Sequence, residues 1–133
     1  MYLLDTNIWL ERLLDQERSE EVGQFLSQIP PDDMAITDFT LHSIGVILNR
    51  LGQETVLLQF VGDLLIDNHV YLATVPPDNF WRIVNIISQF NLDFDDAYQY
   101  VAAEQLNAVI VSFDSDFNRT GRNKQTPSDI INP

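Results

Sequence analysis

Four short apolar segments alternate with longer amphipathic stretches along the whole chain. The apolar segments are residues 1–4 (MYLL), 34–36 (MAI), 70–73 (VYLA) and 108–112 (AVIVS). Segments of this length are typical of buried strands, and the stretches between them place apolar residues at helical spacing. Strands that alternate with helices predict a parallel sheet covered by helices on both faces. The expected fold class is therefore α/β, a three-layer α/β/α sandwich with a central, mainly parallel sheet.

The intervening stretches predict the helices and their ends. We expect helices at about 8–14, 18–28, 53–67 and 95–106, a further helix capped by Thr37 or Asp38, and another opened by Pro76-Pro77-Asp78. The helix at 18–28 has the clearest pattern, because Val22, Phe25, Leu26 and Ile29 fall on one face. Residues 1–133 are expected to form a single domain, since the chain has the length of one domain.

Composition excludes several classes of chemistry. The chain has no cysteine, which removes disulfides, thiolate metal sites and a cysteine nucleophile, and its two histidines are too few for a histidine-rich metal site. No apolar run reaches the roughly 18 residues of a membrane helix. The first residues (MYLLDTNIWLE) have no basic region and no small-residue cleavage site, so a signal peptide is not expected. We therefore expect a cytoplasmic protein with no membrane partner.

The chain is strongly acidic. Twenty acidic and seven basic residues give a net charge of −13. Taken alone, this charge argues against nucleic acid, whose affinity for proteins comes largely from Lys and Arg on phosphates, and it favours a cation or a basic partner. Three of the basic residues, Arg119, Arg122 and Lys124, nevertheless lie within six positions of one another. Such a run is usually a solvated loop, and the alternative is a phosphate-binding group.

Acidic residues occupy the points where strands end and helices begin. Asp5 follows the first strand, Asp93, Asp95 and Asp96 open the helix at 95–106, and Asp114 and Asp116 follow the last strand. A helix cap explains one acid at each place and leaves the others in excess. Because a ligand crevice in such sheets lies outside the carboxyl ends of the strands, Asp5 and Asp114 would meet there if their strands are neighbours. Closely packed carboxylates repel one another unless a cation is present, and Mg²⁺ or Mn²⁺ prefers such oxygen ligands.

Three motifs, in this order, carry a resemblance to a known family. LLDTN near the start, DFDDA at the opening of a late helix and SFDSDF after an apolar strand resemble the signature of the PIN-domain family, which includes VapC-type toxins of toxin–antitoxin pairs. The likeness extends over nearly the whole chain, and TPSDII (126–131) resembles the last strand and turn of the family. It implies a PIN-like α/β/α domain and Mg²⁺- or Mn²⁺-dependent cleavage of RNA.

The resemblance also implies roles for individual residues. It makes Asp5, Asp96 and Asp114 the catalytic metal ligands, adds Asp116 as a frequent further acid, and surrounds them with the polar side chains Thr6, Asn7 and Ser112. One or two ions would activate a water molecule, and no side-chain nucleophile would be needed. Arg119, Arg122 and Lys124 would then hold substrate phosphates beside the site.

The chain departs from the family at one position. The family usually carries a glutamate early in the helix after its second strand, in a pattern like Ser-x-x-Thr-Leu-x-Glu. Here the stretch reads AITDFTLHSIGVIL, which places Ser43 where the glutamate would be. A serine hydroxyl can orient water but brings no charge. His42 beside it is a possible base or ligand, although its spacing favours packing beside the sheet or exposure to solvent, and Asp38 lies too early on the helix to substitute without a different backbone.

Two further interpretations of the sequence remain beside the nuclease. The first is a catalytically degenerate PIN-like module that binds protein or RNA without cleaving, favoured by Ser43 and by the acidic charge. The second, a haloacid-dehalogenase-like phosphatase, is suggested by the two aspartates of SFDSDF, but in that family the motif comes early and is followed by a lysine and further acids. Only seventeen residues follow Asp116, and they contain one lysine, so the phosphatase is set aside.

The resemblance implies two kinds of protein partner. A small antitoxin would block the crevice, often by inserting a basic side chain among the acids, and the acidic surface suits such a partner. Homodimers are common in the family, and the aromatic candidates for an interface are Trp9, Trp81, Tyr98 and Tyr100, although tryptophans are more often part of the core.

Overall fold

Four parallel strands form the sheet in the computed structural model, which describes residues 1–122 and 124–133. The strands are β1 (Tyr2–Leu4), β2 (Met34–Thr37), β3 (Tyr71–Ala73) and β4 (Val109–Val111), in the order β3-β2-β1-β4. All four lie within a residue or two of the segments that the sequence predicts. The expected α/β fold with a parallel sheet is confirmed.

The helices follow the predicted alternation. They are α1 (Thr6–Leu13), α2 (Ser19–Gln28), α3 (Asp38–Arg50), α4 (Glu54–Val61), α5 (Phe80–Phe90), α6 (Phe94–Leu106) and α7 (Pro127–Ile131). The helix expected at 53–67 is interrupted, because α4 passes into a π-helical segment, Gly62–Asp67. Short 3₁₀ turns occur at Pro31–Asp33, Pro77–Asn79 and Ser115–Arg119.

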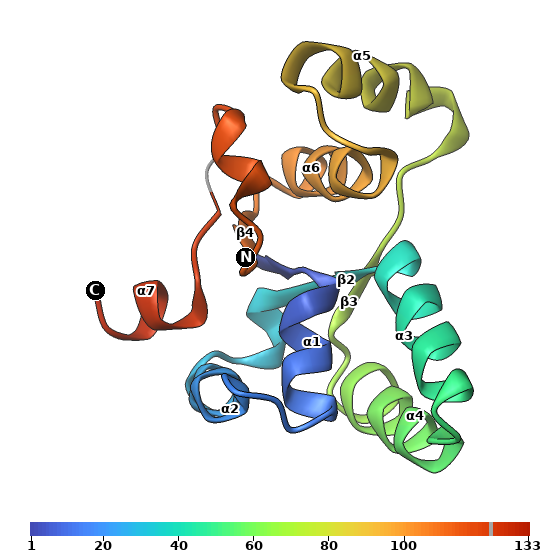
Figure 1. Cartoon of the computed structure of the whole chain (residues 1–133), viewed down its shortest axis with the longest axis vertical. Coiled ribbons are helices and arrows are strands. Elements are labelled where there is room, and N and C mark those ends of the chain that lie inside the picture. Colours follow the sequence, from blue (N-terminus) through green and yellow to red (C-terminus); the bar gives the residue numbers. More distant parts are fainter. Residues whose placement is uncertain (123) are drawn as a thin grey trace.

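Helices lie on both faces of the sheet (Figure 1), and each face has its own apolar core. Side chains of successive strand residues point to opposite faces. Leu3 and Ile110 pack in the cluster formed with α5 and α6, whereas their neighbours Leu4 and Val111 pack in the cluster formed with α1, α2, α3 and α4. Both clusters are almost completely buried. This two-sided burial explains why the strands read as continuous apolar runs in the sequence.

Local signals set the ends of the elements that carry the site. Thr37 caps α3 by accepting a hydrogen bond from the backbone N–H of Thr40 at 3.0 Å, which decides between Thr37 and Asp38 as the cap. Asn91 and Asn107 end α5 and α6 in the left-handed conformation, with φ of 54° and 50°. Asparagine tolerates this conformation better than most residues, so the chain can reverse sharply into α6 and then into β4.

The segment 126–131 differs from its expected form. The resemblance predicted a last strand and turn there, but Thr126 caps the short helix α7, in which Asp129 returns the capping bond. Among the described residues of this segment, strand pairing consists of one bridge between Val111 and Gln125, just before this cap. Pro127 at the first helical position explains the outcome, because it suits a helix start and cannot donate a hydrogen bond to a sheet.

The aromatic residues divide between core and surface. Trp9, Tyr98 and Tyr100 are buried, and only Trp81 of the four interface candidates is well exposed, at 62%. Within the described residues, no helix has the length and apolar character needed to cross a membrane.

Candidate metal centre

Strand β1 and the edge strand β4 lie side by side and are parallel, so their carboxyl ends meet at the same end of the sheet. Residues that continue the two strands are therefore neighbours: the backbone N–H of Asp5 donates to the carbonyl of Val111 at 2.9 Å. From β1 the chain winds outward through β2 and β3, whereas β4 lies on the other side of β1. Such a switch in strand order opens a crevice between the connections that leave the two strands.

Asp5 lies at the floor of this crevice and is only 8% exposed. Its Oδ1 accepts hydrogen bonds from the backbone N–H of Thr6 at 2.8 Å and from Nε2 of Gln99 at 3.1 Å. Its Oδ2 accepts from Oγ of Ser112 at 2.8 Å and from Nδ2 of Asn7 at 3.4 Å. Burial raises the pKa of Asp5, and these hydrogen bonds act in the opposite direction. Asp5 is thus both the cap of α1 and a positioned carboxylate.

The start of α6 supplies a second wall. Asp93 caps the helix by accepting a hydrogen bond from the backbone N–H of Asp96 at 2.9 Å. This cap leaves Asp95 and Asp96 free of a capping role, and both line the crevice. Asp96 lies in the first helical turn and is half-buried.

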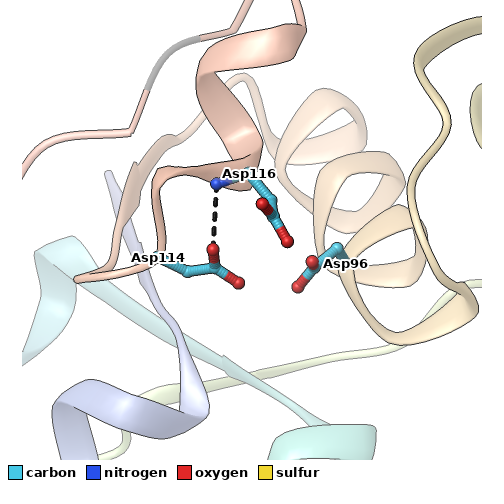
Figure 2. Close-up of side chains that lie close together, drawn as sticks. All are labelled: Asp96, Asp114 and Asp116. Carbon is cyan, nitrogen blue, oxygen red and sulfur yellow. Dashed lines mark hydrogen bonds between the residues drawn. The ribbon is translucent and has the colours of Figure 1, made fainter.

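The loop after β4 supplies the third wall. Asp114 accepts a hydrogen bond from the backbone N–H of Asp116 at 2.9 Å, which turns the chain so that both side chains point the same way. Carboxylate oxygens of Asp96, Asp114 and Asp116 all lie within 4.8 Å of one another. Figure 2 shows the three side chains converging from α6 and from the loop that follows β4.

This crowding changes the protonation of the cluster. Burial, followed by the charge of Asp93 and then of the other nearby carboxylates, raises the pKa of Asp96 to about 7. Burial and the charge of Asp93 also raise the pKa of Asp95. A carboxyl group that keeps its proton near neutral pH indicates a site where negative charge is uncompensated.

The crevice has a volume of about 390 Å³ and is lined by six carboxylates, those of Asp5, Asp93, Asp95, Asp96, Asp114 and Asp116. Thr6, Asn7, Ser43 and Gln99 add neutral polar groups to its wall. Among the described residues, the polar groups of the lining are thus carboxylates, hydroxyls and amides, without imidazole or thiolate. This donor set fits Mg²⁺ or Mn²⁺, which prefer oxygen ligands, and Asp96, Asp114 and Asp116 are the carboxylates close enough to share one ion.

The three basic residues proposed for phosphate binding are placed differently. Arg119 forms an ion pair with Asp116 at 3.2 Å and donates to the carbonyl of Asn91. Arg122 donates to the carbonyl of Ala108 at 3.0 Å, which puts its guanidinium at the amino end of β4, away from the crevice. In the part of the chain that is described, Lys124 does not line the crevice either. The structure thus brings only Arg119 beside the acids.

The helix α3 contributes Ser43 to the crevice wall and no charge. His42 is exposed and lines two hollows other than the crevice, so of its two expected positions, beside the sheet or facing solvent, the structure shows the second. Asp38 is occupied elsewhere: its carboxylate accepts hydrogen bonds from the hydroxyls of Tyr98 and Thr74, both at 2.7 Å. Neither residue takes the place of the absent glutamate.

Gln99 is the residue of the site that the sequence analysis missed. It is 2% exposed, and its side chain joins Asp5 in the β1–α1 connection to Thr37 and Thr40 in the β2–α3 connection. A signal was present, because Gln99 lies three residues after Asp96 on the same face of the helix and is the one amide in the buried run 97–103. Asp93 and Asp95 were noted as acids but not assigned to the site, and both line it.

Comparison with known proteins agrees with this architecture. A family model described as the PIN domain matches residues 2–123. Among the curated proteins, none matches significantly. Solved structures with the same fold include VapC20 from Mycobacterium tuberculosis, a toxin that cleaves the sarcin–ricin loop, with a TM-score of 0.79 and 17% identity over 96% of this chain and all of that one.

Two further solved structures share this fold. A toxin–antitoxin complex from Klebsiella pneumoniae has a TM-score of 0.76 at 23% identity, and FitAcB from Neisseria gonorrhoeae has 0.75 at 20%. Each match covers 96% of this chain and 98% of the other. At these identities the likeness concerns the fold, whereas the family model extends over nearly the whole sequence. The chain belongs to the PIN-domain family.

Proposed function

We propose that this protein is a Mg²⁺- or Mn²⁺-dependent endoribonuclease that hydrolyses phosphodiester bonds. The observation that carries the proposal is the convergence of Asp96, Asp114 and Asp116 within 4.8 Å, above the buried Asp5. Structural neighbours that are toxins, one of them cleaving an RNA loop, support RNA as the substrate.

Each acid has a distinct part in the proposed site. Asp96, Asp114 and Asp116 would hold the ion. The carboxylate of Asp5 accepts four hydrogen bonds that fix its orientation, and it would position a water molecule or a second ion. A bound ion would lower the pKa of a water molecule and neutralise charge on the phosphate. Thr6, Asn7 and Ser112 orient the side chains around Asp5, and Ser43 is left to hold water at the α3 wall.

A test of the metal site precedes a search for the substrate. Calorimetric titration of Mn²⁺ into the wild type and Asp114→Asn should show binding, with a raised melting temperature, only for the wild type. Asp32→Asn is a matched control, because Asp32 is exposed just before β2, at the opposite end of the sheet. Equal binding by wild type and Asp114→Asn would contradict the proposal.

A second candidate function is a non-catalytic module that binds protein or RNA. The specific observation in its favour is Ser43, which leaves the α3 wall of the crevice without a charge. Ser43→Glu separates the two functions in an RNA cleavage assay. A wild type with measurable cleavage supports the nuclease, whereas activity that appears only in Ser43→Glu identifies a degenerate site.

The proposed partners follow from the same comparisons. A structural neighbour that is a toxin–antitoxin complex supports a small antitoxin, and six carboxylates in one crevice suit a basic side chain of such a partner. A homodimer remains a proposal, with the exposed Trp81 on α5 as its surface candidate. Co-expression with an adjacent open reading frame and sedimentation of the purified chain test these two points separately.

A further inference from the structure

The carboxylate crevice has little positive charge with which to hold RNA. Its wall carries six carboxylates, and among the described residues no lysine or arginine lines it. Arg119 is paired with Asp116, and Arg122 is bound at the opposite end of β4. Cationic side chains on phosphates, the usual source of affinity for nucleic acid, are therefore scarce at the point where cleavage is proposed.

Four aromatic side chains gather next to this crevice. Phe39 on α3, Phe80 at the start of α5, and Phe94 and Tyr98 on α6 form a continuous group, which we call the aromatic platform. Ring centroids lie 5.9 Å apart for Phe39 and Tyr98, and 6.1 Å apart both for Phe94 and Tyr98 and for Phe80 and Phe94. Residues from three helices thus build one apolar surface.

The platform is partly open to solvent. Phe80 is 39% exposed and Phe94 is 43% exposed, whereas Tyr98 is 6% exposed and forms the base. A hollow of about 290 Å³ lies over Phe39, Phe80 and Tyr98, with Asp38 and His42 at its rim. The hydroxyl of Tyr98 is occupied, since it donates to Asp38 and accepts from the backbone N–H of Val75 at 3.0 Å. Beside the hydrogen-bonded carboxylate of Asp38, the hollow presents ring surface and the His42 imidazole to a ligand.

The platform and the carboxylate crevice adjoin each other at two places. Phe39 lines both hollows. Phe94 lies in sequence between Asp93 and Asp95, which line the crevice. An RNA whose phosphate lies at the carboxylates would therefore have a neighbouring base close to the aromatic rings.

We propose that the aromatic platform binds an unpaired nucleobase of the RNA, by stacking, next to the phosphate that is cleaved. The proposal rests on the proposed nuclease function and names single-stranded or looped RNA as its substrate class. Stacking is suited to this site because every base has a π face and because the interaction does not depend on positive charge. The imidazole of His42 is placed to donate a hydrogen bond to the edge of the base or to its sugar.

The test compares variants of Phe94 in which the side chain stays apolar but differs in whether it has an aromatic face. The probe is a short fluorescent phosphorothioate oligoadenylate, which resists hydrolysis, titrated at fixed salt with Mn²⁺ present and followed by anisotropy. Phe94→Leu should weaken binding at least about fivefold, the lower end of what removing one base–aromatic stack costs. Phe94→Trp, which keeps a stacking face, should bind at least as tightly as wild type. Trp81→Leu is the control, because Trp81 is exposed on α5 and is not one of the four rings of the aromatic platform.

Further measurements separate stacking from damage to the crevice and from self-association. Unchanged Mn²⁺ affinity in Phe94→Leu shows that the crevice is intact, and the same oligonucleotide made double-stranded should not compete. Equal binding by the wild type and Phe94→Leu, equal loss in the leucine and tryptophan variants, or no binding by the wild type would each overturn the proposal. A change in sedimentation without a change in RNA binding would also overturn it, in favour of self-association through these rings. If the platform binds a base but the protein is not a nuclease, the result is different: the wild type binds the oligonucleotide but neither binds Mn²⁺ nor cleaves RNA.

Discussion

The amide nitrogen of Gln99 donates a hydrogen bond to Oδ1 of Asp5 at 3.1 Å, across 94 positions of sequence. The same side chain donates to Oγ1 of Thr40 at 2.8 Å and accepts from Oγ1 of Thr37 at 2.7 Å. Gln99 therefore ties α6 to the ends of β1 and β2, which are the elements on which the carboxylate crevice is built. A buried residue whose three polar contacts are all made holds its neighbours in one arrangement.

Gln99→Leu should destabilise the protein by about 2–4 kcal/mol, because it leaves buried partners of the amide without a hydrogen bond. Urea unfolding followed by circular dichroism measures this difference. Gln105→Leu, on the exposed side of the same helix, should change stability by less than about 0.5 kcal/mol. Similar decreases in the free energy of unfolding of the two variants would show that the hydrogen bonds of Gln99 contribute no more to stability than an exposed side chain does.

Stability without metal should fall as the pH rises from about 4 to 7. In the folded chain Asp96 keeps its proton up to a pKa of about 7, whereas in the unfolded chain it loses the proton near 3.8. The folded state then binds more protons in this window, so the free energy of unfolding decreases with increasing pH. Asp5 and Asp95, whose pKa values are also raised, act in the same direction. Asp96→Asn should flatten this slope in urea titrations made at a series of pH values, and a slope unchanged by the substitution would contradict the assignment.

Mn²⁺ affinity should have the opposite dependence on pH. An ion displaces the proton of Asp96, so binding should weaken by up to about tenfold for each unit below pH 7. Calorimetry at several pH values measures this change. Asp32→Asn is the control and should have the same pH dependence as the wild type. A Mn²⁺ affinity of the wild type that does not change with pH would place the ion away from Asp96.

Ser43→Glu should strengthen Mn²⁺ binding and lower the stability of the metal-free protein. The new carboxylate would join six others in a crevice of about 390 Å³, so it adds a ligand when metal is present and repulsion when it is absent. His42→Glu is the matched control, since it adds the same charge one residue away on an exposed position outside the crevice. Thermal melts with and without Mn²⁺ report both effects, and identical behaviour of the two variants would mean that the α3 wall does not reach the ion.

Arg119 and Arg122 should differ in what their removal changes. Arg122→Ala removes the bond to the carbonyl of Ala108 and should cost about 1 kcal/mol of stability, with Mn²⁺ affinity unchanged. Arg119→Ala removes the cation paired with Asp116 and should raise Mn²⁺ affinity by a few-fold, with little effect on stability because the pair is exposed. Denaturation and calorimetry on the same two variants measure both quantities. A loss of Mn²⁺ affinity in Arg122→Ala would contradict the placement of its guanidinium away from the crevice.

The sequence by itself determined the strand and helix alternation, and with it the location of the acids. Short apolar segments such as 108–112 are typical of buried strands, and a parallel sheet places the residues after such strands at one edge. The convergence of Asp5 with the residues after β4 was conditional on β1 and β4 being neighbours, and the family resemblance supported that pairing. The caps formed by Asp93 and Thr126 also depend on local sequence alone. At 126–131 the family resemblance predicted a strand, whereas Pro127 is typical of a helix start.

Only the tertiary structure decided which side chains share the crevice and which do not. Arg119 and Arg122 are three residues apart in sequence, yet one is beside the acids and the other is at the far end of β4, because the loop after Asp116 turns back along that strand. The hydrogen bonds of Gln99 and the contacts of the aromatic platform could not be predicted from sequence spacing, because they join elements that are distant in sequence and meet only in the packed fold. Sequence spacing predicts neighbours along a helix or strand, whereas contacts between elements depend on how the whole core is filled.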